Sequence, residues 1–140
     1  VLGPGIMYTA NTIVAFFYVV PMMVHIDTPP PTLEEVLIRM RPGDVLTHCF
    51  RPFPNTPATP EGGVLPAVLE ARKRGVIFDI GHGMGSFSFK TARTMLANGF
   101  MPDCISSDVH ALCIEGPAFD LLTTLSKFIC LSCGTSSFVS

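Results

Sequence analysis

The feature that most constrains this sequence is a regular alternation of short apolar runs with longer amphipathic runs from Val19 onward. Glycine, proline or asparagine stands at most of the junctions between them. This pattern is typical of β-strands that alternate with α-helices and build a parallel sheet. The chain has 140 residues, of which 48% are hydrophobic, so it is long enough for one α/β domain with a substantial core.

The alternation predicts four strands, each followed by a helix. The predicted strands are Val19–Ile26, Asp44–Cys49, Val76–Ile80 and Cys104–Ser107. The predicted helices are Thr32–Met40, Val64–Arg74, Ser86–Asn98 and Phe119–Ile129. Thr32 and Glu35 have the spacing of a capping box, and Gly75 stands where a helix C-cap is expected. Four prolines forbid regular structure in the long loop of residues 50–60, and loops of this length are usually functional.

Charge and cysteine usage narrow the range of partners and compartments. The formal net charge is −2 without a basic run, so we expect neither nucleic acid nor an anionic membrane surface as a partner. The longest apolar run, Ile13–Val24, is shorter than the roughly 20 residues that cross a bilayer. The five cysteines are odd in number and scattered, which favours free thiols and a cytoplasmic location.

Histidines and aspartates fall at or just after the ends of all four predicted strands. They are His25, His48, Asp79 with His82, and Asp108 with His110. Since the carboxyl ends of parallel strands form one rim, these side chains are expected around one pocket. Imidazole and carboxylate are ligands for a divalent metal, with zinc as the first choice, and a carboxylate can also take a proton from bound water.

Each of these residues also has a structural reading. A histidine after an apolar strand is more often a hydrogen-bonded structural residue, Asp79 could cap the following loop, and Asp108 could be a turn residue. The glycines of Gly81–Gly85 lack the spacing of a dinucleotide fingerprint and most simply permit a tight turn. Cys130 and Cys133 form an isolated CxxC, which we interpret as incidental.

Longer motifs, in order along residues 21–128, decide between these readings. They resemble the second half of the dihydroorotase-like amidohydrolase/deacetylase family, within the amidohydrolase superfamily. The matching segments are PMMVH (21–25), PPPTLEE (29–35), RPGDVLTHCF (41–50), GVIFDIGHGMGSFSF (75–89), PDCISSDVH (102–110) and GPAFDLLTTLSKF (116–128). Several long motifs in one order are far more specific than any single motif.

The resemblance implies a partial (β/α)₈ TIM barrel, with this chain supplying approximately strands five to eight. His25 and His48 would be metal ligands, while Asp108 would both bind metal and shuttle a proton. His82 and His110 would line the substrate pocket. The implied activity is a zinc-dependent hydrolysis of amide or cyclic amide bonds, in particular deacylation of a small N-acyl amino-acid-like substrate.

The family's first-strand histidines and its carboxylated lysine have no counterpart in this sequence. Residues 1–20 and 130–140 diverge from the family, which leaves 21–129 as the half-barrel domain. The strand edges of half a barrel would be unpaired, so we expect self-association or association with a missing N-terminal half. The alternative to an active hydrolase is an inactive fragment that binds at most one metal.

Overall fold

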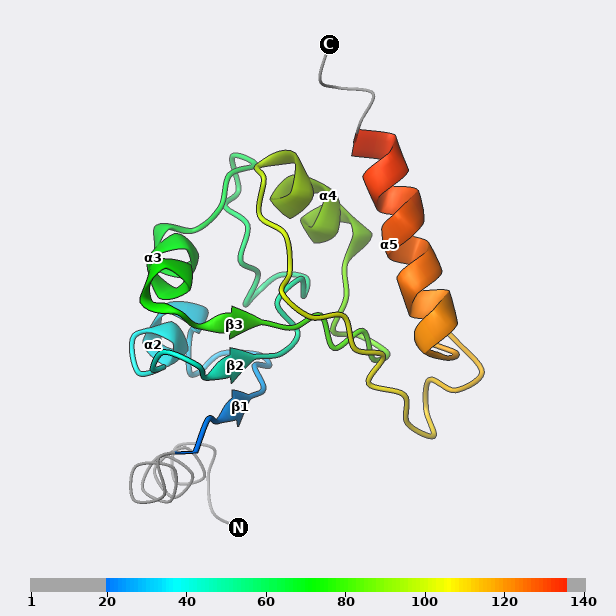
Figure 1. Cartoon of the computed structure of the whole chain (residues 1–140), viewed down its shortest axis with the longest axis horizontal. Helices are drawn as coiled ribbons and strands as arrows, with labels where there is room; N and C mark the ends of the chain where they lie inside the picture. Colours follow the sequence, from blue (N-terminus) through cyan, green and yellow to red (C-terminus); the bar gives the residue numbers. More distant parts are fainter. Residues whose placement is uncertain (1–19, 136–140) are drawn as a thin grey trace.

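Three short parallel strands organise the computed structural model of this chain, which describes residues 20–135. The strands are β1 (Met23–Val24), β2 (Val45–Leu46) and β3 (Ile77–Phe78), and their order in space is β1-β2-β3 (Figure 1). Met23 pairs with Val45, which in turn pairs with Ile77. A helix separates each strand from the next, so the predicted strand–helix alternation and parallel sheet are confirmed.

The predicted fourth strand, Cys104–Ser107, is reduced to one parallel bridge between Asp79 and Cys104. Backbone hydrogen bonds continue this pairing, because His82 N donates to Ser106 O at 3.0 Å. The ladder does not extend toward the start of β3. There the Phe78 N–H donates to the Asp103 carboxylate at 2.8 Å and not to a backbone carbonyl. The segment therefore lies beside β3 as the pattern predicts, without forming a regular strand.

The helices are α2 (Leu33–Leu37), α3 (Pro66–Arg74), α4 (Phe89–Ala97) and α5 (Leu121–Thr135). The capping box at α2 is confirmed, since Thr32 Oγ1 accepts from Glu35 N at 3.2 Å and Glu35 Oε2 accepts from Thr32 N at 2.8 Å. Gly75 ends α3 with a φ of 95°, a left-handed conformation that favours glycine. The predicted end of the last helix at Ile129 was wrong, because α5 continues to Thr135.

The two faces of the sheet differ in burial. Successive residues of a strand point to opposite faces. Leu46 and Phe78, which pair with each other, are buried in one cluster with apolar side chains of α2, α3 and α4. The other paired row is less covered, since Val45 and Ile77 are half-buried and Met23 is 66% exposed. Helices thus cover one face of the sheet, as they do on the outside of a barrel.

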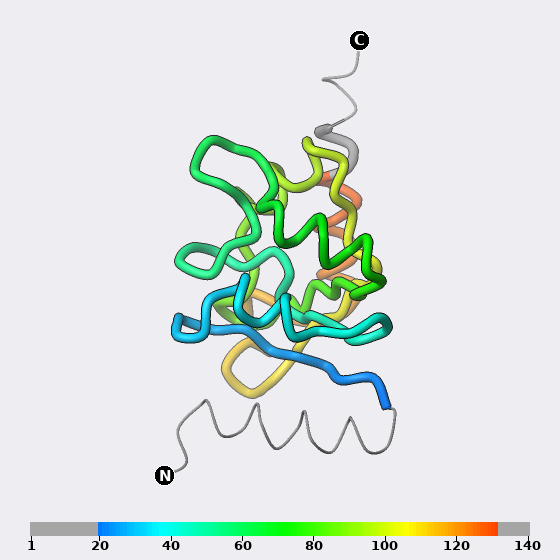
Figure 2. Tube along the Cα trace, turned by 90° about the vertical axis from the view of Figure 1, so that its left-hand side faces the viewer, coloured from blue at the N-terminus to red at the C-terminus, as the bar shows by residue number. Residues whose placement is uncertain are grey.

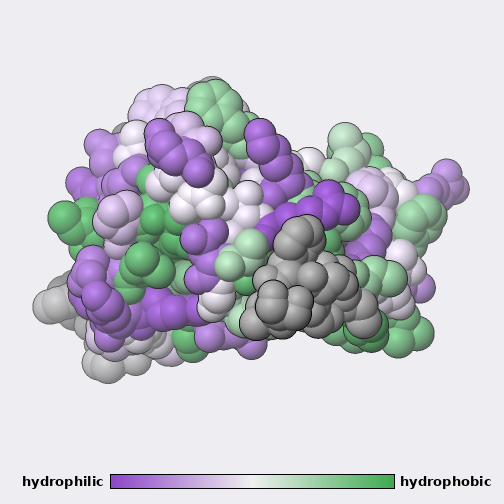
Figure 3. Space-filling model, turned by 90° about the horizontal axis from the view of Figure 1, so that it is seen from above, coloured by the Kyte–Doolittle hydropathy of each residue, from purple (hydrophilic) through white to green (hydrophobic). Residues whose placement is uncertain are grey.

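The other side of the molecule is formed by α4 and α5, which pack against each other. Phe128 of α5 reaches the main core, where its ring lies 6.3 Å from that of Phe50. Figure 3 shows apolar atoms interleaved with polar ones at the end of the molecule that carries α5. The exposed large apolar residues of this region are Val109, Leu112, Ile114, Phe119, Leu121, Leu122 and Ile129. Among the helices of residues 20–135, none has the length and apolarity needed to cross a bilayer.

Residues 1–19, which hold most of the predicted divergent N-terminal segment, lie outside the described residues, as do residues 136–140 of the predicted tail. The β1 segment runs across the lower part of the described chain in Figure 2. Within the described residues β1 pairs with β2 alone. One edge of the sheet is therefore formed by β1, as expected for the first strand of a partial barrel.

The capping box at α2 gives the first test of this fold. Thr32→Ala removes the acceptor for Glu35 N, so we expect the free energy of unfolding to fall by about 1 kcal/mol. Thr32→Ser keeps the hydroxyl and should stay close to the wild type. Urea denaturation followed by circular dichroism measures both variants, and equal stability of Thr32→Ala and the wild type would contradict the assigned cap.

Candidate functional site

The carboxyl ends of the parallel strands bring the predicted site residues to one rim. His25 directly follows β1, His48 follows β2 after one residue, and Asp79 directly follows β3. Asp108 follows the segment that pairs with β3. This placement agrees with the expectation from the strand pattern, and the individual contacts show which of these residues meet.

His25 and His48, which are 23 residues apart in the sequence, are in direct contact because they follow neighbouring strands. Their ring centroids are 4.4 Å apart, and the ring planes stand at 88° to each other. His48 is only 3% exposed, while His25 is exposed at the surface of the rim. The two histidines predicted as metal ligands are therefore in contact.

The backbone at His48 is the reason why its ring reaches this position. His48 lies two residues after Leu46, so regular alternation would point it toward the helix-covered face. Its φ of 62° is left-handed, which is uncommon for a residue with a side chain and interrupts that alternation. Asp108 has the same property, with a φ of 47°. Such conformations cost about 1–3 kcal/mol each and cluster at functional sites.

A backbone carbonyl sets the proton position on His48. The Nδ1 atom of His48 lies 2.7 Å from Gly81 O. Since a carbonyl only accepts hydrogen bonds, Nδ1 carries a proton, and in the neutral ring the lone pair is then on Nε2. This arrangement is the usual one for a histidine that binds metal through Nε2, with its other nitrogen held by a carbonyl.

Gly81 is required for this contact by its shape. It has a φ of 48°, and a Cβ atom there would lie 2.3 Å from Thr47 Oγ1 and 2.7 Å from His48 Nδ1. No larger residue fits without displacing the His48 ring. The glycine-rich loop therefore permits a tight turn, as predicted, and also leaves room for the candidate ligand.

Asp79 lies beneath the rim as the centre of a buried network. Its Oδ2 atom accepts hydrogen bonds from Thr47 Oγ1 and from Ser106 Oγ, both at 2.7 Å. Ser106 Oγ also lies 3.2 Å from Gly81 N. Asp79 is 2% exposed, so it ties the end of β2 to the segment that leads to Asp108. The sequence placed Asp79 among the residues expected at the pocket, with capping of the loop as the alternative, but its two hydroxyl partners have no sequence signal of their own.

The surroundings of His25 favour its neutral form. Burial lowers the pKa of His25, and the adjacent His48 lowers it further. The charges of Asp27 and Asp108 raise the pKa of His25 and so act in the opposite direction. A neutral imidazole is the form that a metal binds.

Arg51 supports the rim from the proline-rich loop. Its guanidinium is buried, donates to the Ile26 carbonyl, and pairs with Asp27 Oδ1 at 3.0 Å. Arg51 Nε is buried without a hydrogen-bond partner. The proline-rich loop was predicted to be functional from its length, but Arg51 has no sequence signal that predicts this contact.

Asp108 is exposed and lies close to the glycine-rich loop. A Cβ atom on Gly83 would come within 2.8 Å of Asp108 Oδ2. Within the described residues, however, no group of three or more histidine, cysteine or carboxylate side chains is arranged to hold a metal ion. The two histidines fit such an ion by chemistry and proximity, and Asp108 stands near them without completing a cluster.

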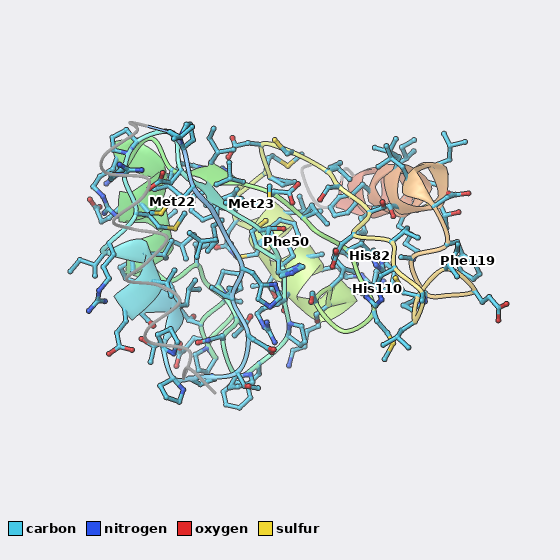
Figure 4. All side chains as sticks on the ribbon, turned by 90° about the horizontal axis from the view of Figure 1, so that it is seen from below. Met22, Met23, Phe50, His82, His110 and Phe119 are labelled. Atoms are coloured by element: carbon cyan, nitrogen blue, oxygen red, sulfur yellow. The ribbon has the colours of Figure 1, made fainter. Side chains whose placement is uncertain are left out.

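His82 and His110, the predicted pocket residues, differ in accessibility. His82 is 3% exposed and its ring stacks on Phe87 at 4.7 Å, whereas His110 is exposed. Figure 4 labels both residues in the region between the main body and α5, with Phe119 farther out. The His82 ring nitrogens are both bonded, Nδ1 with Gly83 O at 2.9 Å and Nε2 with Lys127 Nζ at 3.0 Å.

Cys49, the sequence neighbour of His48, lacks the properties of a nucleophile. Cys49 is buried next to His48, and burial raises the pKa of its thiol well above the ordinary value. A thiol held in its protonated form is a poor nucleophile. Burial and a raised thiol pKa therefore favour a structural role for Cys49.

Comparison with known proteins identifies the class to which this arrangement corresponds. No family model matches the chain. The chain is 41% identical over 110 residues to a deacetylase from Agrobacterium fabrum, which covers 79% of this chain and 27% of that protein. A deacetylase from Enterococcus faecalis is 44% identical over 117 residues, covering 77% of this chain and 30% of the relative.

Solved structures give the same result. The chain superimposes on an adenine deaminase with a TM-score of 0.76 and 42% identity, covering 79% of this chain and 31% of that one. A dihydroorotase gives a TM-score of 0.74 and 38% identity, covering 86% and 31%. The predicted resemblance to the dihydroorotase-like amidohydrolases is thus confirmed, and the small parallel sheet with its helices is compatible with part of the TIM barrel of these neighbours. The chain spans about 30% of the length of the relatives that it matches.

Gly81→Ala tests the close contact at His48. A methyl group would collide with Thr47 and His48, so we expect a loss of about 1–3 kcal/mol in unfolding free energy beyond the cost of the backbone strain. Gly43→Ala is the matched control, because Gly43 has a φ of 87° with nothing within 4 Å of the added Cβ. Urea denaturation compares the two variants, and equal losses would argue against the contact.

Proposed function

We propose that this chain is the C-terminal part of a metal-dependent amidohydrolase and supplies approximately strands five to eight of its barrel. The observation that carries the proposal is the contact between His25 and His48 at the ends of neighbouring parallel strands. It occurs in a chain that is 38–44% identical to segments of a dihydroorotase, an adenine deaminase and deacetylases. Contact and similarity together favour a hydrolase of amide bonds over a purely structural histidine pair.

Two histidines of this chain are the proposed metal ligands. His25 and His48 would hold the metal, with the His48 Nε2 lone pair directed by the hydrogen bond of Nδ1 to Gly81 O. A bound divalent metal supplies Lewis-acid chemistry and lowers the pKa of a coordinated water. Zinc is our proposed metal, because it is commonly bound by imidazole together with carboxylate.

Asp108 is the proposed third ligand and the residue that moves the proton. A carboxylate at this position can accept a proton from the attacking water and pass it to the leaving amine nitrogen. Its exposed position and its effect on the pKa of His25 support this role. The closeness of Gly83 to Asp108 Oδ2 keeps the carboxylate beside the rim.

For the substrate we propose a small N-acyl amino acid or a cyclic amide. The support comes from the names of the relatives, which are deacetylases, a dihydroorotase and an adenine deaminase. His110 is accessible to a bound molecule, while His82 would shape the pocket from a buried position. A cytoplasmic location, inferred from the scattered cysteines, remains part of the proposal.

A second candidate function is metal binding without catalysis. Two observations favour it. Residues 20–131 contain no cluster of three metal-binding side chains, and the chain covers only 27% of the length of the deacetylase relative. The less covered sheet face and the exposed apolar residues near α5 favour a partner, either another copy or a protein segment that supplies the other strands. In this reading, the chain becomes active only with its partner half.

Hydrolysis of N-acetyl amino acids and of dihydroorotate, in buffer with added zinc, separates the two candidates. Under the first, the purified chain releases product, and Asp108→Asn lowers the rate by about 10²–10⁴-fold, because the proton carrier is lost. Glu61→Gln, a change at an exposed carboxylate in the loop before α3, is the control and should leave the rate unchanged. Zinc binding without turnover by the wild type would favour the second candidate.

A further inference from the structure

Lys127 of α5 contacts a site residue that is far away in the sequence. Its Nζ atom lies 3.0 Å from Nε2 of His82 and also donates to the carbonyl of Pro117. Lys73, by contrast, is exposed and pairs with Glu70, and Lys90 is exposed on α4. Lys127 forms no ion pair with any carboxylate of residues 20–131. Its two bonded acceptors are neutral.

The chemistry of this contact fixes the proton on His82. An ammonium group has donors only, so Nε2 of His82 must be the acceptor and Nδ1 must carry the ring proton. The other side of the ring agrees, because Nδ1 lies 2.9 Å from the Gly83 carbonyl, which can only accept. His82 is therefore held as the neutral Nδ1–H form.

Packing holds the ring in the same orientation. His82 stacks on Phe87 with an angle of 20° between the rings, and Phe87 in turn packs 5.5 Å from Phe128, the neighbour of Lys127 on α5. Burial lowers the pKa of His82 and the Lys127 charge lowers it further, against the opposing effect of the Gly83 carbonyl. Both the charge and the burial thus keep a second proton off the ring.

The loop that carries His82 lies directly against the segment of Asp108. His82 N donates to Ser106 O and Gly83 N donates to Ser107 O, both at 3.0 Å. The space at Gly83 is filled by Asp108 Oδ2, which would be 2.8 Å from a Cβ atom there. A shift of His82 therefore moves the surface against which the Asp108 carboxylate rests.

We propose that Lys127 is a positioning residue, which holds His82 as the Nδ1–H tautomer and thereby fixes the glycine-rich loop against Asp108. The effect on catalysis rests on the proposed function of Asp108, whereas the effect on His82 does not. Helix α5 in this account is a part of the site, because it supplies the ammonium group that sets the ring. Lys127 itself acts through His82 and need not touch the substrate.

The test is the protonation state of His82, measured by long-range ¹H–¹⁵N NMR of the chain labelled at histidine. The chain has only four histidines, so a His82→Gln spectrum assigns the signal. In the wild type at neutral pH we expect a protonated Nδ1 and an unprotonated Nε2. A protonated Nε2 in the wild type would overturn the proposal without any variant.

Substitutions at Lys127 then test the cause. Lys127→Met removes the donor to Nε2, so the ¹⁵N signal of His82 Nε2 and the ¹³C signal of the Asp108 carboxyl should both shift, although the Gly83 carbonyl still favours a proton on Nδ1. Lys127→Arg keeps a cationic side chain that can donate hydrogen bonds but cannot accept them, so it should retain the wild-type signals. Lys90→Met, at an exposed position of α4, is the matched control and should change neither signal.

Unchanged His82 and Asp108 signals in Lys127→Met would show that Lys127 does not position the loop. If that variant fails to fold, the wild-type spectrum still decides the tautomer, and Lys127→Gln, which also removes the cation, is measured in its place. None of these signals requires turnover. Failure of the proposed amidohydrolase activity would therefore be seen separately, in the hydrolysis assay.

Discussion

The parallel pairing of β1, β2 and β3 is the constraint on which the rest of this structure depends. Each strand has only two residues in the ladder, yet the register places their carboxyl ends side by side. His25 and His48 can meet at 4.4 Å only because their strands are neighbours and run in the same direction. Helices on one face bury Leu46 and Phe78, and this burial keeps the register from slipping.

Hydrogen bonds of buried groups fix the orientation of the side chains at the carboxyl ends of the strands. Asp79 joins Thr47 to Ser106, and the Gly81 carbonyl orients His48. The left-handed backbone at His48 and Asp108 is strained, so the surrounding contacts must offset its cost. Strained backbone of this kind clusters at functional sites, which supports a functional interpretation.

The local features of the fold could be predicted from the sequence, because they depend on neighbouring residues. The capping box at Thr32 and the glycine C-cap at Gly75 are of this kind. The fourth strand is reduced because the Asp103 carboxylate, and not a backbone carbonyl, accepts the hydrogen bond from Phe78 N. The extension of α5 to Thr135 was missed because its small polar residues are also typical of an irregular tail. At the site, strand-end histidines gave a signal, whereas Thr47, Ser106 and Lys127 act through contacts between distant segments that no spacing rule reveals.

The central claim is that this chain brings His25 and His48 together in a form that binds metal. Equilibrium dialysis against zinc, with zinc per chain measured by elemental mass spectrometry, tests it on the wild type, His25→Ala and His48→Ala. His110→Gln serves as a histidine control outside the proposed ligand set. The account predicts about one zinc per wild-type chain and an affinity at least about tenfold weaker in both ligand variants, with His110→Gln unchanged. A wild-type chain that binds no zinc, or binding that survives both alanine substitutions, would contradict it.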